Sequence, residues 1–464
     1  MARLVELDDR VVDELGSQLR GGLIRPGDQQ YESARKVYNG MIDRRPALIA
    51  RCVDAADVIA AVRFAGEREL DLAVRGGGHN GAGLGTCDGG LVVDLSPMRG
   101  VTVDPASATA RVAGGCVLGD VDHATHPFGL ALPMGFISTT GVGGLTLGGG
   151  IGHLTRRLGL TIDSLLGADV VLADGTLVHA DEGQHPDLFW ALRGGGGNFG
   201  VVTSFHFRLH PVSTVVAGPM LWEMDRASEI MAAYRDLIWD APGEVSGFFA
   251  FLAVPPAPPF PEYLWLRPMC GVVWCCAEGT VATEQALSRA RELAPALDGV
   301  QSMPLPVLQS AFDALYPPGL QWYWRADFLD QLDDVAIHRH VEQAADLPTP
   351  LSTMHLYPID GAVHRVGPED TAFRFRDARF AEVIVGVDPD PAGAEAIKSW
   401  AVRYWEALHP FSVGGGAYVN FLMDEGEDRI RATYGANYPR LAAIKRRYDP
   451  RNLFHLNQNI EPAA

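Results

Sequence analysis

The sequence contains no apolar run long enough to cross a bilayer, and its first ten residues lack a basic segment followed by an apolar one. The first absence argues against a transmembrane helix and the second against a secretory signal. We therefore expect a cytoplasmic protein that has no membrane partner.

Cysteine is scarce and scattered, and no C-x-x-C pair occurs. This pattern favours buried, reduced thiols over a disulfide framework or a zinc site. No second candidate ligand stands near His79 at metal spacing, so no metal site is expected. The six cysteines are Cys52, Cys87, Cys116, Cys270, Cys275 and Cys276.

Positive charge is also in short supply, because 38 Lys and Arg residues face 57 Asp and Glu residues, a formal net charge of -19. Such a chain repels polyanions, which argues against nucleic-acid binding as its main activity. A length of 464 residues with 47% hydrophobic content suits a large globular core divided into about two domains.

Glycine, in contrast, is abundant and gathers in short blocks. A β-type run, 72–74, leads into Arg75, Gly76, Gly77, Gly78, His79, Asn80 and Gly81. Backbone without side chains can turn tightly and approach a ligand, as in a phosphate cradle. The block matches G-x-G-x-x-G, as does 195–200, but glycine-rich loop and β-rich sequence follow the two matches, where a dinucleotide fingerprint needs a helix.

A second glycine block spans 139–154, between stretches rich in core residues. Each glycine in an ordered element costs roughly 0.5–1 kcal/mol of backbone entropy, so simple packing does not explain the block. We expect a large, flat or phosphorylated ligand to lie against this backbone.

The order of elements predicts an α+β protein. Strand 48–52, a helix from Asp54 through Gly66 and strand 72–74 form a β-α-β unit, and strands 91–95, 101–103 and 110–112 are expected as a meander. Beyond 211 the glycine blocks stop, and strand-like runs alternate with amphipathic helices. This second part predicts an antiparallel sheet backed by helices, with strands at 247–254, 263–273, 321–328, 353–357 and 379–387.

Seven motifs in the same order resemble those of the berberine bridge enzyme-like branch of the vanillyl-alcohol oxidase/p-cresol methylhydroxylase superfamily of flavoenzymes, including bacterial enzymes of the 6-hydroxy-D-nicotine oxidase type. They span nearly the whole chain, at 75–80, 140–152, 158–163, 187–194, 197–203, 418–420 and 448–454. The resemblance implies a two-part FAD-binding domain, residues 1–214 and 412–464, with a substrate domain inserted at 215–411.

The resemblance also implies that His79 carries FAD covalently through the flavin 8α-methyl group. Some members add a cysteinyl link shortly before the second glycine block, but Ile137 or Ser138 stands at that position here, so a single histidyl link is expected. The loop 75–81 would hold the pyrophosphate. Further cofactor contacts implied by the matching positions are Thr140, Gly141, Gly144, Leu147, Gly149, Val202, Tyr418, Asn420 and, more loosely, Asn457. His153, at the end of the second block, is a further candidate for a cofactor contact.

The implied activity is hydride transfer from a carbon next to an amine or hydroxyl of a small organic substrate to the flavin, with dioxygen as acceptor and hydrogen peroxide as product. Thr140 matches a position where a small side chain leaves room for oxygen. Three alternatives stay open: a tailoring enzyme of secondary metabolism, an electron-transferring dehydrogenase, and a flavoprotein without catalysis.

The proton acceptor is not given by the resemblance, because Phe421 and Gly81 stand where relatives have tyrosines. Alternation along 353–357 places Thr353, His355 and Tyr357 on one face, and Tyr323, Arg325 and Asp327 similarly share a face. Glu382 is an isolated carboxylate in an apolar run. The candidate bases are therefore His153, which we favour, then Tyr357, and also His355 and Glu382.

Overall fold

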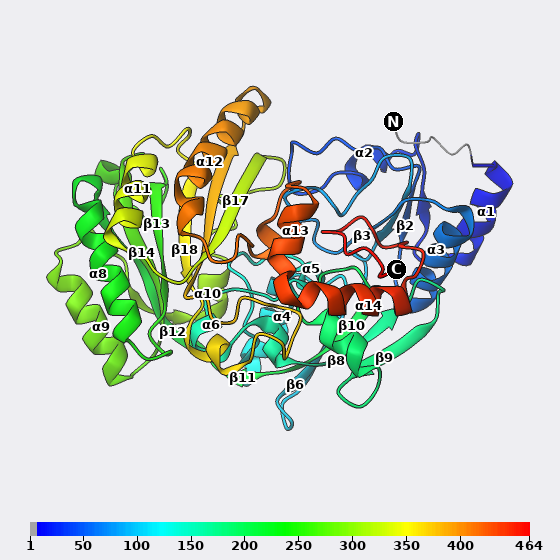
Figure 1. Cartoon of the computed structure of the whole chain (residues 1–464), viewed down its shortest axis with the longest axis horizontal. Helices are drawn as coiled ribbons and strands as arrows, with labels where there is room; N and C mark the ends of the chain where they lie inside the picture. The colour runs from blue at the N-terminus through cyan, green and yellow to red at the C-terminus, as the bar shows by residue number, and fades with distance from the viewer. Residues whose placement is uncertain (1–6) are drawn as a thin grey trace.

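The computed structural model describes residues 7–464 and shows two halves side by side (Figure 1). One half contains the N-terminal part of the chain, up to β11 (His210–Pro211), together with the C-terminal helices. The other half contains the middle of the chain and consists of one large sheet with helices on its outer face. The mixture of helices and sheets confirms the predicted α+β class.

A four-stranded sheet in the order β1-β2-β4-β3 forms one end of the first half. Strands β2, β4 and β3 are parallel, so β4 belongs to this sheet and not to a meander. Helix α3 covers the sheet and is capped by the Asp54 carboxylate, as the sequence predicted. The elements are α1 (Asp9–Gln18), β1 (Leu23–Ile24), α2 (Tyr31–Ala34), β2 (Leu48–Arg51), α3 (Ala55–Arg68), β3 (Leu72–Arg75) and β4 (Leu91–Asp94).

A five-stranded antiparallel sheet in the order β5-β6-β10-β8-β9 completes this half. Between its strands the chain forms short helices, among them α5 within the second glycine block, which periodicity could not reveal. The elements are β5 (Val101–Asp104), β6 (Thr109–Ala113), α4 (Leu118–Thr125), β7 (Leu130–Ala131), α5 (Val142–Leu147), α6 (Thr155–Leu158), β8 (Leu165–Val171), β9 (Leu177–Asp181), α7 (Pro186–Leu192), β10 (Val201–Arg208) and β11 (His210–Pro211).

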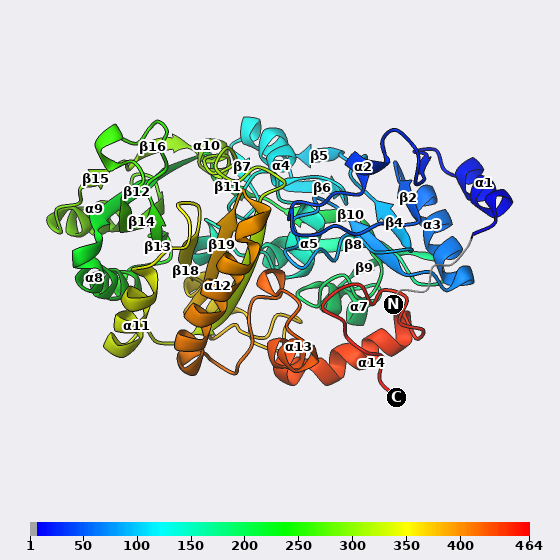
Figure 2. The same ribbon diagram turned by 90° about the horizontal axis from the view of Figure 1, so that it is seen from above.

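The second half is built on an eight-stranded sheet in the order β15-β12-β14-β13-β18-β19-β17, with β16 also paired to β12. Helices α8, α9, α11 and α12 cover one face of it (Figure 2). The elements are β12 (Thr214–Glu223), α8 (Ala227–Asp240), β13 (Gly247–Ala253), β14 (Pro268–Ala277), α9 (Val281–Glu292), β15 (Leu297–Asp298), β16 (Gln301–Pro304), α10 (Leu305–Gln309), β17 (Gln321–Leu329), α11 (Asp334–Ala344), β18 (Thr353–Pro358), β19 (Phe380–Asp388) and α12 (Ala394–Leu408).

The antiparallel sheet backed by helices was predicted correctly, but one strand was misplaced. Residues 263–273 were expected as a strand, whereas 262–264 form a 3-10 turn and β14 begins only at Pro268. Leu266 has a φ of +59°, which a strand does not allow. Strand β12 and helices α8 and α11 had no counterpart in the predicted elements.

The C-terminal segment returns to the first half. Helix α13 (Glu427–Tyr434) leads into α14 (Tyr438–Tyr448), which lies next to α7, and the red ribbon crosses the blue and cyan half in Figure 1. The buried Lys445 ammonium donates to Asn198 O at 2.8 Å and pairs with Asp449 at 2.7 Å. The domain boundaries at 214 and 411 stay predictions, although β12 starts at Thr214 and α12 ends at Leu408.

The six cysteines are buried, as predicted. Among the described residues, no helix combines the length and the apolar character that crossing a membrane requires.

Candidate active site

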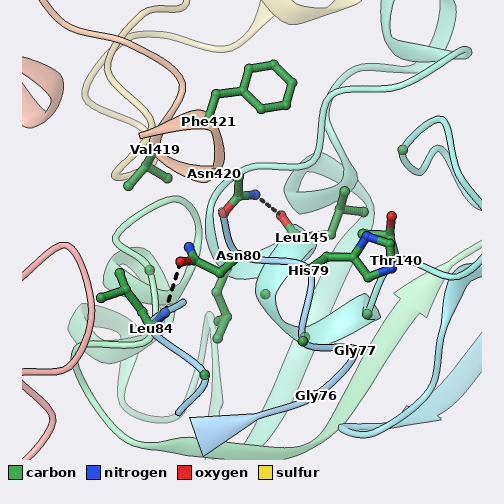
Figure 3. Close-up of a pocket in the computed structure, with 18 of the residues that line it drawn as sticks. Gly76, Gly77, His79, Asn80, Leu84, Thr140, Leu145, Val419, Asn420 and Phe421 are labelled. Atoms are coloured by element: carbon green, nitrogen blue, oxygen red, sulfur yellow. Dashed lines mark hydrogen bonds between the residues drawn. The ribbon is translucent and has the colours of Figure 1, made fainter. Parts of the chain in front are cut away.

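A cavity of about 320 Å³ lies between the two halves. Its walls combine both glycine blocks with the C-terminal segment around Asn420 (Figure 3). The inner face of the eight-stranded sheet also lines it. Residues from motifs that are far apart in the sequence are therefore neighbours around this cavity.

Strand β3 delivers His79 to this cavity. The imidazole stacks on Tyr38, with ring centroids 3.9 Å apart, and Thr139 Oγ1 lies 3.1 Å from its Nε2 atom. Enclosure by the protein lowers the pKa of His79 to about 4, so the ring is neutral near pH 7. A neutral imidazole keeps a lone pair that can bond to a ligand.

The loop that carries His79 is fixed from both sides. Arg75 forms a buried ion pair with Asp94, 3.1 Å long, and also donates to Lys36 O. Asn80 Oδ1 accepts from Leu84 N at 3.1 Å (Figure 3). Within residues 7–464, the backbone N–H groups of Gly77 and Gly78 have no hydrogen-bond acceptor. Free N–H groups in such a loop suit an anionic ligand.

The two glycine blocks touch each other. A Cβ atom on Gly77 would lie 2.4 Å from Gly141 N, and one on Gly141 would lie 2.3 Å from Gly77 N. At Gly144 the situation differs, because an added Cβ meets no protein atom within 4 Å, although this glycine lines the cavity. Backbone at Gly144 therefore leaves space that a ligand can occupy.

Two predicted cofactor glycines do not line the cavity. A Cβ on Gly81 would lie 2.7 Å from the Trp324 ring, so this glycine makes room for a tryptophan. Gly149 has a φ of +124° and faces Phe373, so it serves the turn after α5. The structure therefore places neither glycine on the cavity wall, where a direct ligand contact was predicted.

The C-terminal segment closes one side of the cavity through Tyr418 and Asn420. Asn420 Nδ2 donates to Leu145 O at 3.1 Å (Figure 3) and to the Tyr418 hydroxyl at 2.8 Å. That hydroxyl accepts from Gly150 N at 3.0 Å. Asn457 Nδ2 donates to Gly197 O at 3.0 Å. Thr140, Leu147, Val202 and Asn457, all predicted cofactor contacts, also line the cavity.

On the sheet, the alternation along β18 is as predicted. Thr353, His355 and Tyr357 line the cavity, whereas Met354 and Leu356 are in the core under the helices. The Tyr357 hydroxyl lies 2.6 Å from His355 Nδ1. Burial lowers the pKa of His355 to about 3 and raises the pKa of Tyr357 well above 10, so both side chains are uncharged near pH 7.

Along β17 and β19, the polar side chains that were predicted as substrate-site candidates point away from the cavity. Tyr323, Arg325 and Asp327 do share a face, but Trp322 and Trp324 line the cavity instead. Glu382 also lies outside the cavity, with its carboxylate 3.6 Å from His340 Nδ1 and its pKa raised by burial. Its placement among the candidate bases was wrong, because Val383 and Val385 face the cavity.

His153, the favoured base, is separated from the cavity by Phe136. The Phe136 ring meets His153 edge-on, with centroids 4.9 Å apart, and stacks on Tyr357 at 4.2 Å. His153 is 4% exposed and lines a separate small cavity. The structure therefore places His153 behind Phe136 and not on the wall of the main cavity, where it was predicted.

Sequence reasoning missed the aromatic residues of the cavity. Alternation along 321–328 pointed equally to both faces, and the polar set was chosen over the tryptophans. No pattern signalled the long-range partners. The missed lining residues are Tyr38, Phe136, Tyr316, Trp322 and Trp324.

The residues present fit FAD. The backbone without side chains at 76–78 and at Gly141, Gly143 and Gly144 suits phosphates and a flat ring, and His79 offers a neutral nitrogen on the same wall. The site as a whole is that of a flavoprotein.

Comparison with known proteins also indicates an FAD-binding protein. Residues 46–181 match an FAD-binding domain model, and residues 417–461 match the model "Berberine and berberine like". An FAD-linked oxidoreductase of Dictyostelium discoideum is 32% identical, covering 98% of this chain and 97% of its own. The (R)-6-hydroxynicotine oxidase of Paenarthrobacter nicotinovorans is 31% identical over 96% of this chain and 97% of its own.

A solved structure shows the same arrangement. The 6-hydroxy-D-nicotine oxidase of Arthrobacter nicotinovorans superposes with a TM-score of 0.85 at 27% identity, over 96% of this chain and 98% of the other. This chain therefore belongs to the berberine bridge enzyme-like family of FAD-linked oxidoreductases, as the motifs predicted.

Gly144→Ala tests whether the cavity backbone is reserved for a ligand. Since Gly144 lies inside helix α5, alanine should stabilise the cofactor-free protein by roughly 0.5–1 kcal/mol. We expect the variant to fold but to purify with clearly less flavin per chain, measured by absorbance. Gly100→Ala, at an open position away from the cavity, is the control. Full flavin content in Gly144→Ala would contradict this assignment.

Proposed function

We propose that the protein is an FAD-dependent oxidase that removes a hydride from an amine or alcohol carbon of a small organic substrate, with dioxygen as electron acceptor. The observation that carries this proposal is the single cavity that joins His79 and the glycine blocks to the hydrogen-bonded pair His355 and Tyr357. Oxygen consumption with panels of amines and alcohols tests it, because turnover must yield hydrogen peroxide.

In this proposal FAD is linked through His79 alone. The neutral imidazole faces the cavity, and Tyr38 and Thr139 fix its orientation. Ile137, which with Ser138 is one of the two residues expected at the position of the second link, lines the cavity, and none of the six cysteines lines it. The pyrophosphate would lie against residues 76–78 and the start of α5, since free N–H groups attract anions.

Bound FAD supplies the redox chemistry by accepting the substrate hydride and passing two electrons to dioxygen. The protein must take up the N–H or O–H proton that the substrate loses. Tyr357 suits this role because its hydroxyl faces the cavity and lies 2.6 Å from His355 Nδ1, which can accept the tyrosine proton in turn. Phe136 and Phe421, on either side of Tyr357, exclude water from this pair.

Replacing His79 tests the covalent link. Acid precipitation of the wild-type protein should leave the yellow flavin in the pellet, whereas His79→Ala should release it into the supernatant. His123→Ala, on the exposed side of α4, should behave as wild type. Release from the wild type, or a flavin-bearing peptide that contains a cysteine, would rule out the single histidyl link.

Replacing Tyr357 tests the proton route. Tyr357→Phe should slow anaerobic flavin reduction by about 10²-fold, a common loss for a general base. Because the pKa of His355 is near 3, the wild-type rate should show no titration of this histidine between about pH 5 and 8. His153→Gln should leave the rate unchanged. The reverse outcome, with a slow His153→Gln and a normal Tyr357→Phe, would reassign the base.

Thr140→Leu tests oxygen as the acceptor. Thr140 lines the cavity, and a leucine would fill space that dioxygen needs. We expect reoxidation of the reduced enzyme to slow roughly tenfold, about 1.4 kcal/mol in activation free energy, while reduction by substrate is spared. Thr146→Val, buried outside the cavity, is the control. A wild type that reoxidises no faster than free reduced flavin would favour an electron-transferring dehydrogenase.

A further inference from the structure

Six aromatic side chains form a continuous wall on the sheet side of the cavity: Phe136, Tyr316, Trp322, Trp324, Tyr357 and Phe421. We refer to them as the aromatic wall. Neighbouring ring centroids are 5.3 Å apart for Tyr316 and Trp322, 6.0 Å for Trp322 and Trp324, and 6.3 Å for Trp324 and Phe421. The series continues to Tyr357 at 6.1 Å and to Phe136 at 4.2 Å.

The wall depends on residues from four separate parts of the chain. Phe136 precedes the second glycine block, Tyr316 precedes β17, the tryptophans and Tyr357 stand on β17 and β18, and Phe421 belongs to the C-terminal segment. Trp324 can reach its place only because residue 81 is glycine, where a Cβ would lie 2.7 Å from the indole ring.

Charge is absent from this wall. Among the described residues that line the cavity there is no Asp, Glu or Lys, and the single guanidinium, that of Arg75, is already paired with Asp94. The charges of β17 and β19 lie on the opposite face, where Arg325 pairs with Glu425 at 2.6 Å and Asp327 pairs with Arg429 at 2.8 Å.

The hydrogen-bonded pair of His355 and Tyr357 is neutral as well. Burial keeps His355 unprotonated and Tyr357 protonated near pH 7, so their pair offers hydrogen bonds without a net charge. A carboxylate or an ammonium group buried here would lose its hydration and find no counter-ion. A flat neutral ring, in contrast, could stack on the tryptophans.

On the basis of the proposed function, we infer that the substrate is an uncharged aromatic molecule, whose ring stacks on the aromatic wall and whose hydroxyl or neutral amine hydrogen-bonds to Tyr357. Sugars lack the flat ring, and amino acids and carboxylates carry charge, so these classes are excluded from the site.

Matched ligand pairs test the inference by binding alone. Perturbation of the flavin absorbance of the holoprotein gives dissociation constants for 4-tert-butylphenol against 4-(trimethylammonio)phenol, which differ in positive charge at the same shape. The pair 4-hydroxybenzamide and 4-hydroxybenzoate tests negative charge in the same way. Comparison of 4-tert-butylphenol with 4-tert-butylcyclohexanol tests the flat ring, because the second compound has a saturated ring. We expect each neutral phenol to bind at least about tenfold more tightly than its partner.

Variants locate the binding site. Trp324→Leu should weaken 4-tert-butylphenol about tenfold through lost stacking, whereas Trp239→Leu, on helix α8 and outside the cavity, should not. Binding of 4-(trimethylammonio)phenol as tight as that of 4-tert-butylphenol, or tighter, would indicate that the aromatic wall binds cations. A preference for the anion would indicate a counter-ion on the wall. Either result, or no binding of both neutral phenols, would overturn the inference. Protein that purifies without a flavin spectrum would instead contradict the proposed function.

Discussion

The structure depends on the contact between two glycine blocks that are some sixty residues apart. Gly77 and Gly141 approach so closely that a single methyl group on either would collide with the backbone of the other. This contact places the His79 loop beside the N-terminus of α5 and forms one wall of the cavity from backbone alone. A flat, phosphorylated cofactor can lie against such a wall because no side chain stands in its way.

The opposite wall follows from the two-residue period of the β-strand. On β17 the tryptophans face the cavity, while Arg325 and Asp327 point to the helices and to the C-terminal segment. One set of strands therefore gives an uncharged face towards the cavity and a charged, ion-paired rear face. The ion pairs from Arg325 and Asp327 to Glu425 and Arg429 also attach the C-terminal segment to the sheet, which holds Tyr418 and Asn420 against α5.

Much of the cofactor side could be predicted from the sequence because its signals are local. The glycines, His79 and Asn420 occur in short motifs that can be recognised in the sequence by their residues and their order. The sheet side of the cavity was harder to predict, because it depends on which face of each strand points into the cavity and which face packs under the helices. A period of two gives two equal choices, so the face of β18 was predicted correctly, whereas the polar face chosen on β17 points away from the cavity. His153 failed for a related reason, since the intervening Phe136 ring is close in space but seventeen residues away in sequence.

The central claim is that FAD lies against the wall that the two glycine blocks form together, with its redox-active ring facing the sheet. A crystal structure of the flavin-bound protein tests it most directly. The account predicts continuous electron density from the His79 imidazole to the flavin ring, with the pyrophosphate against residues 76–78 and the ring opposite His355 and Tyr357. Flavin density that does not join His79, or a flavin ring that does not face the aromatic wall, would contradict it.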